Sequence, residues 1–160
     1  MTKTILIFIA RLIFAAVFGI GLWFKLTGIE ATAGYIASVG LPSPTVLAWL
    51  AVVFETTLVV AFLTGVFFSE AALLAALYVL FLAIAFHWPP HNPMEFGLFV
   101  DHFTFIAGLL FAAVHGPGSR WAVPAGILWR SARRHARRRI ENQAGRSRDP
   151  FSSARCRVRA

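Results

Sequence analysis

Charge and cysteine are both scarce in this chain. Of its 160 residues only 14% are charged, whereas 58% are hydrophobic. A soluble domain of this size cannot hide so much apolar surface in its own core, so lipid is the expected solvent for most of the chain. The single cysteine, Cys156, excludes an intrachain disulfide and a CxxC redox pair. No motif for covalent cofactor attachment is present, so any redox chemistry would need a bound group to carry it.

Basic residues are also rare, except at one end of the chain. The formal net charge is +8, and 12 of the 15 lysine and arginine residues follow Gly116. Residues 125–160 are therefore predicted to be a basic, disordered cytoplasmic tail, separate from a membrane domain over residues 1–124. The tail has neither interleaved aromatic residues nor a folded nucleic-acid module, so nucleic acid is not an expected partner. Anionic lipid headgroups, rather than nucleic acid, are the alternative ligand for the basic residues of this tail.

Long apolar segments make up most of the remaining chain. A transmembrane helix needs roughly 20 mainly apolar residues. Four segments meet or approach that length, and they predict helices at about 5–24, 46–68, 71–88 and 96–114. The predicted fold is therefore all-α, a membrane bundle of four helices in contact with the lipid bilayer. Ser69 and Glu70 are predicted to form the turn between the second and third helices, and a short helix around Ala31 to Ser38 is predicted to lie over the bundle mouth.

The distribution of basic residues predicts how the bundle is oriented. The flank after Val114 outweighs every other helix flank in lysine and arginine, which places the C-terminus in the cytoplasm. Four crossings then place the N-terminus there as well. Tryptophan prefers the two membrane interfaces, and the five tryptophans are consistent with this topology. Three fall at predicted outer helix ends and two just past the inner end of the fourth helix: Trp23, Trp49, Trp88, Trp121 and Trp129.

A few ionisable residues lie inside or at the ends of the predicted spans. A charged group inside a membrane costs at least ~2.5 kcal/mol, so such residues usually face the bundle interior and one another. The candidates are Arg11, Lys25, Glu55, His87, Asp101 and His102. At the rise of an α-helix, all except Arg11 fall in the outer half of the membrane. They predict a polar pocket that opens to the extracytoplasmic side.

A quinone head group suits such a pocket, because its ring faces are apolar and its two carbonyl oxygens accept hydrogen bonds. Candidate pocket residues that would bind it are Arg11, Lys25, Glu55, His87 and His102. Reduction of a quinone consumes protons, and Glu55, Asp101 and His102 are the candidate proton relay. The alternative interpretation is structural: Arg11 with Glu55, and Lys25 with Asp101, would be ion pairs that hold helices together.

A metal site is not expected from this sequence. The segment HWPPH, from His87 to His91, brings two histidines close in sequence. Its two prolines prevent the helical spacing that would direct both imidazoles to one metal ion. Only Asp101 and His102 remain as plausible further ligands.

With these residues placed, the chain resembles the DoxX family of small bacterial membrane proteins over about residues 5–124. The resemblance rests on ordered features: Arg11 in the first helix, GLWFKLTG from Gly21, YIASVGLPSP with Gly40 and Pro42, Glu55, His87, and GPGSRW around Gly118 and Arg120. The family is a four-helix membrane bundle linked to oxidoreductase complexes, including a subunit of a thiosulfate:quinone oxidoreductase. The resemblance implies a quinone-linked or redox-associated subunit in the bacterial cytoplasmic (inner) membrane. The chain departs from the family where Asp101 and His102 replace a usual Lys-Asn pair.

Three hypotheses about function follow. The leading one is a membrane subunit of a redox-linked complex that binds a quinone or a similar small molecule, working with a protein partner. The alternative is a non-enzymatic membrane scaffold that recruits a partner protein. The third is a small-molecule transporter, although the helices lack the paired repeat and broken centres that transporters use. The sequence leaves open whether the chain forms a homo-oligomer.

Overall fold

The computed structural model describes residues 2–118, 122–123, 126–127, 138 and 140–141. The chain divides into two compact units, Met1–Gly126 and Ile127–Ala160, and the fold below is that of the first. The predicted basic tail lies almost wholly outside the described residues, as do Trp121 and Trp129.

Five helices account for the regular structure of residues 2–118. They are α1 (Thr2–Thr27), α2 (Ile29–Ser38), α3 (Pro44–Thr64), α4 (Phe68–His87) and α5 (Pro93–His115). All except α2 are long and apolar enough to cross a membrane. The predicted all-α architecture with four spanning helices is therefore confirmed, and the predicted short helix at the bundle mouth is α2.

The helix ends follow from the residues that lie there. Pro44 and Pro93 begin α3 and α5, where a missing backbone N–H costs nothing. Before α5, the Asn92 side chain accepts a hydrogen bond from the Glu95 amide at 2.9 Å, and Glu95 in return accepts one from the His91 amide at 2.8 Å. This reciprocal cap fixes the loop between α4 and α5 at the start of α5.

The turn between α3 and α4 is not where the sequence predicted it. Gly65 ends α3 in the left-handed region, with φ of 77°, and α4 begins at Phe68. Ser69 and Glu70, the predicted turn residues, lie instead in the first turn of α4. The prediction was wrong because the apolar residues after Gly65 continue the hydrophobic run, whereas backbone conformation at the glycine decides where the helix ends.

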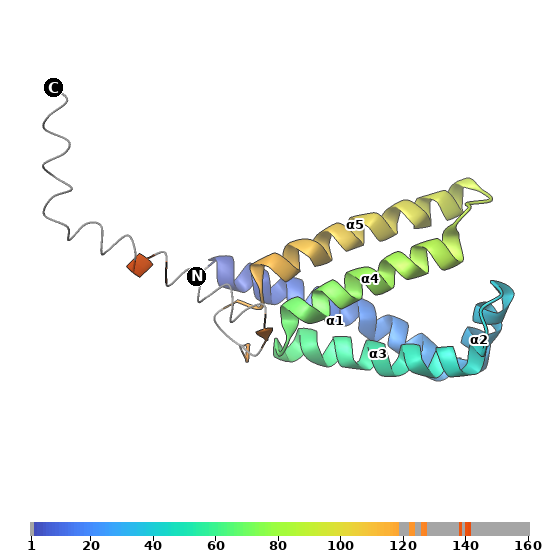
Figure 1. The fold of residues 1–160 in the computed structure, drawn as a ribbon, viewed down its shortest axis with the longest axis horizontal. Coiled ribbons are helices and arrows are strands. Elements are labelled where there is room, and N and C mark those ends of the chain that lie inside the picture. The colour runs from blue at the N-terminus through green and yellow to red at the C-terminus, as the bar shows by residue number, and fades with distance from the viewer. Residues whose placement is uncertain (1, 119–121, 124–125, 128–137, 139, 142–160) are drawn as a thin grey trace, which may run out of the picture. The chain divides into compact units, whose positions relative to one another are not determined.

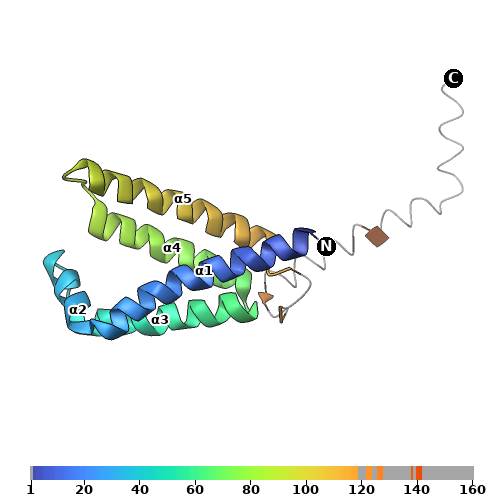
Figure 2. The same cartoon turned by 180° about the vertical axis from the view of Figure 1, so that it is seen from behind.

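The helices form two antiparallel pairs that diverge toward one end. α1 packs on α3 and α4 packs on α5, and the pairs separate toward α2 (Figures 1 and 2). We call the end that carries α2 and the α4–α5 loop the mouth end. The opposite end, with the start of α1 and the α3–α4 turn, is the turn end.

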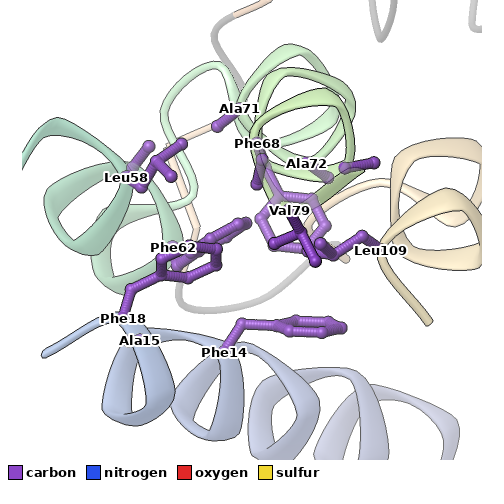
Figure 3. Packing of buried hydrophobic residues seen from close by; sticks show 13 residues of the cluster. Phe14, Ala15, Phe18, Leu58, Phe62, Phe68, Ala71, Ala72, Val79 and Leu109 are labelled. Atoms are coloured by element: carbon purple, nitrogen blue, oxygen red, sulfur yellow. The ribbon is translucent and has the colours of Figure 1, made fainter. Parts of the chain in front are cut away.

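The hydrophobic core lies toward the turn end and draws on all four spanning helices. Phe14 and Phe18 of α1 lie against Phe62 of α3, with ring centroids 5.6 and 5.7 Å apart (Figure 3). Phe68 of α4 meets the Phe62 ring edge-on, and Leu109 of α5 is fully buried. Small residues let α4 approach closely, because Ala71, Ala72, Ala75 and Ala76 are all buried. This packing holds the turn end closed and leaves space between the helix pairs at the mouth end.

Candidate functional site

A buried ion pair links three helices near the middle of the bundle. The Lys25 ammonium of α1 lies 2.9 Å from Oε1 of Glu55 on α3, and the Tyr78 hydroxyl of α4 donates to the same oxygen at 2.8 Å. The Glu55 side chain is only 3% exposed, whereas Lys25 is 21% exposed. Glu55 lies ~16 Å along α3 from Pro44, about halfway through the span. The polar contact therefore sits at mid-membrane depth, where water is scarce.

The second carboxylate oxygen of Glu55 differs from the first. Glu55 Oε2 is buried and has no hydrogen-bond partner among the described residues. Gly21 lies beside it, and a methyl group at that position would come within 3.5 Å of Oε2 and 3.6 Å of the Lys25 nitrogen. A buried acceptor without a donor costs roughly 1–3 kcal/mol. Oε2 is thus a buried acceptor that the described residues leave without a donor.

Two histidines meet closer to the mouth end. The rings of His87, at the end of α4, and His102 on α5 have centroids 5.0 Å apart. Nδ1 of His102 lies 2.6 Å from the carbonyl of Leu98 one turn earlier. That carbonyl can only accept, so Nδ1 carries the hydrogen and Nε2 is the nitrogen left to bind or exchange a proton.

These polar groups border a pocket at the mouth end of about 420 Å³. That volume lies within the usual range of small-molecule sites, which are mainly apolar with a few polar groups. Its lining has this character: Lys25, Thr32, Tyr35, Ile36, Leu41, Leu47, Leu50, Ala51, Phe54, Tyr78, Phe81, Leu82, Phe86, His87 and His102. Lys25 and Tyr78 connect the pocket to Glu55 behind them.

The short helix α2 borders the pocket at the mouth end. Thr32, Tyr35 and Ile36 of α2 contribute to the lining. The Tyr35 ring stacks on Phe86 of α4, with centroids 4.8 Å apart and an interplanar angle of 18°. Gly28 separates α2 from α1, which lets the chain turn after its first crossing and lie over the bundle. We call α2, Ile29–Ser38, the α2 roof.

The structure brings most of the predicted site residues together. Lys25, His87 and His102 line the pocket, and Glu55 contacts it through Lys25. Asp101 is exposed on α5 and does not line the pocket. Lys25 pairs with Glu55, whereas the structural alternative had paired it with Asp101.

Arg11 lies apart from the pocket, at the turn end. Its side chain is 1% exposed and donates to the backbone carbonyls of Phe62, at 3.0 Å, and of Leu63. It also donates to the carbonyl of Pro117, at 3.5 Å. The last carbonyls of a helix have no intrahelical donor, so Arg11 supplies one to the end of α3 and holds the segment after α5 beside it.

Tyr78 and Tyr35 are the site residues that sequence reasoning missed. Tyr78 is the only hydroxyl in the central part of α4, and it lies at a depth similar to that of Glu55. A mid-span hydroxyl near the depth of a mid-span carboxylate was a usable signal, because both groups need a partner in a membrane interior. Tyr35 begins the YIASVGLPSP stretch of the family resemblance, but its place at the pocket depends on how α2 folds back.

Among the residues that the structure describes, no group of three or more histidine, cysteine, aspartate or glutamate side chains is arranged to hold a metal ion. His87 and His102 form only a pair.

Comparison with known proteins gives the chain a family context. The DoxX family model matches residues 6–88, a range that contains Arg11, Lys25, Glu55, Tyr78 and His87. The inner membrane protein YphA of Escherichia coli strain K12 is 33% identical over 85 residues, which cover 53% of this chain and 61% of the relative. The matched region thus spans less than two thirds of that relative. No solved structure matches this chain.

Proposed function

Because this chain belongs to the DoxX family and is a multi-pass membrane protein, we propose that it is a redox-linked subunit of the bacterial inner membrane that binds a quinone head group in its mouth-end pocket. The observation that carries the proposal is the contact of Lys25 and Tyr78 with Glu55 at the pocket wall. YphA is an inner membrane protein by name, which supports the location.

The pocket offers what a quinone ring requires. Aromatic and aliphatic side chains such as Phe54 and Leu82 can cover the ring faces. Lys25 has ammonium protons beyond the one directed at Glu55, so it can donate to a quinone carbonyl oxygen. His87, which lines the pocket at the end of α4, can donate to the second oxygen.

The same residues can supply protons for quinone chemistry. Reduction of a quinone to a quinol takes up two electrons and two protons, and in this proposal the electrons come from a donor on a partner protein. Lys25 gives one proton to a carbonyl oxygen and is left neutral, and Glu55 can restore that proton through their direct contact once its carboxylate has itself taken up a proton from water. His102 gives the second proton from Nε2 in its imidazolium form, after the ring has taken up a proton from water, with Asp101 beside it on the exposed face of α5.

A titration of purified protein in lipid nanodiscs with a short-chain quinone tests this proposal. We expect saturable binding to the unaltered protein, and about tenfold weaker binding to Glu55→Gln and His102→Ala, because each change removes a polar group at or beside the head group. His115→Ala is a matched control. His115 makes the same contact to a carbonyl one turn earlier, 2.8 Å from Phe111, but lies at the end of α5 away from the pocket.

The scaffold alternative is favoured by one observation. Asp101 is exposed within a membrane-spanning helix, where an unpaired charge is costly, so a partner helix could cover it. In that case the polar groups of the pocket only hold helices together. The same titration separates the two functions, since a scaffold predicts no saturable quinone binding or binding indifferent to both pocket changes.

A further inference from the structure

The wall of the pocket between α3 and α4 opens sideways. The ring contact of Phe54 with Tyr78, centroids 5.0 Å apart, closes the gap between these helices below the pocket. Nearer the mouth end the two helices contribute Leu50 and Phe81 to the lining. These side chains are also 59% and 50% exposed, so they belong both to the pocket and to the outer surface of the bundle.

The depth of this opening decides what it faces. Leu50 lies six residues inside the start of α3, and Phe81 lies six residues inside the end of α4. Each is therefore ~9 Å along its helix from the mouth end. Since the spanning helices are about as long as the ~30 Å hydrocarbon layer is thick, the opening faces lipid chains rather than headgroups or water.

On the water side the pocket is bordered by the α2 roof, in which Ile36 is 7% exposed, whereas Tyr35 is 53% exposed and stacks on Phe86. A ligand that came from water would pass beside this ring pair. A ligand that came from the membrane would have to move only the flexible Leu50 side chain and the Phe81 ring at the surface.

We propose that the pocket takes its ligand from the bilayer through the opening between Leu50 and Phe81, and that the bound ligand keeps an apolar chain in that opening. The ligand class is thus a lipid amphiphile with a small polar head, held by Lys25, and a linear apolar chain. This inference rests on the proposed function and adds which part of the ligand the site distinguishes. Leu50 and Phe81 select for the apolar chain of the ligand and not for its head group.

Two quinones and two substitutions test the inference. The ligands are a methoxy-substituted benzoquinone without a side chain and the same ring with a decyl chain. Leu50→Trp fills the opening, and we expect it to weaken binding of the decyl quinone about tenfold. Binding of the chainless ring should change less than about twofold. Leu63→Trp is the matched control on α3, since Leu63 is 49% exposed at the turn end, and it should leave both ligands unaffected.

A crosslink tests the direction of entry independently. With Cys156 replaced by serine, cysteines at Tyr35 and Phe86 can be joined by a short thiol-specific reagent, which locks the α2 roof to α4. We expect the association rate of the decyl quinone to stay within about twofold of that of the same double-cysteine protein without the crosslink. A large fall in that rate on crosslinking would show entry from water and overturn the inference.

The outcomes distinguish this inference from the proposal beneath it. If neither quinone binds the unaltered protein, the proposed function fails and the inference fails with it. If both bind and Leu50→Trp affects neither, or affects both equally, the lateral opening is wrong while the quinone site stands.

Discussion

At the scale of single residues, Glu55 is the centre of the account. Its Oε1 is held by Lys25 and Tyr78, while Oε2 is buried without a partner among the described residues. A carboxylate held on one oxygen and unsatisfied on the other is costly as a purely structural element. That asymmetry favours a role in binding or proton transfer over a role in fastening helices.

A double-mutant cycle tests whether Lys25 and Glu55 depend on each other. Lys25→Met leaves a buried carboxylate without its cation, and we expect it to lower the free energy of unfolding by about 3 kcal/mol. Adding Glu55→Gln to Lys25→Met should restore at least half of that loss, because the second change removes the unpaired charge. Reversible unfolding in mixed detergent gives the energies. Additive effects of the two changes would contradict the coupling.

At the scale of elements, the sequence predicted the spanning helices well because their apolar lengths are set by the bilayer. It predicted α2 for a different reason, since Gly40 and Pro42 mark its end. Hydrophobicity did not locate the α3–α4 turn, which depends on the left-handed conformation of Gly65. The ion pair of Arg11 with Glu55, offered as the structural alternative, does not form, because Arg11 donates to backbone carbonyls at the end of α3 and the sequence does not show which way each helix face points.

The α3–α4 turn provides the next prediction. A methyl group at Gly65 would lie 2.7 Å from the Cβ atom of Ala122, and an L-residue there would also be strained at φ of 77°. We expect Gly65→Ala to destabilise the protein by about 2 kcal/mol, since the left-handed conformation alone costs 1–2 kcal/mol. Thermal unfolding in detergent measures the effect.

Gly19→Ala is the control for that substitution. Gly19 is helical and has nothing within 4 Å of the added methyl group. It should be neutral or stabilising by up to about 1 kcal/mol, because alanine favours the helix. If Gly65→Ala and Gly19→Ala destabilised the protein equally, the left-handed turn would not be the reason why position 65 requires glycine.

At the scale of the whole molecule, the bundle divides into two halves with different tasks. The turn end contains the aromatic core and the carbonyls held by Arg11. The mouth end contains the pocket, the ion pair and the histidines. The start of α1 and the end of α5 lie at the same end of the bundle, as an even number of crossings requires (Figure 1). That this end is cytoplasmic stays a prediction from the basic residues.

The sequence could predict some parts of the mouth-end site but not others. The ionisable residues of the spans were identified correctly as unusual, because charge in lipid is rare for energetic reasons. The partnership of Lys25 with Glu55, and the exclusion of Asp101 from the pocket lining, depend on how two helix pairs diverge. That divergence arises from packing among all four helices, which no single segment encodes.

Photoaffinity labelling with an azido-quinone tests the central claim, that the mouth-end pocket is a quinone site, most directly. After illumination in nanodiscs and digestion, we expect label on peptides containing pocket residues of α3 and α4, such as Phe54, Tyr78 and Phe86. An excess of unlabelled decyl quinone should remove that label. Label that competitor does not reduce, or that lies mainly on lipid-facing residues of α5 such as Phe111, would contradict the claim.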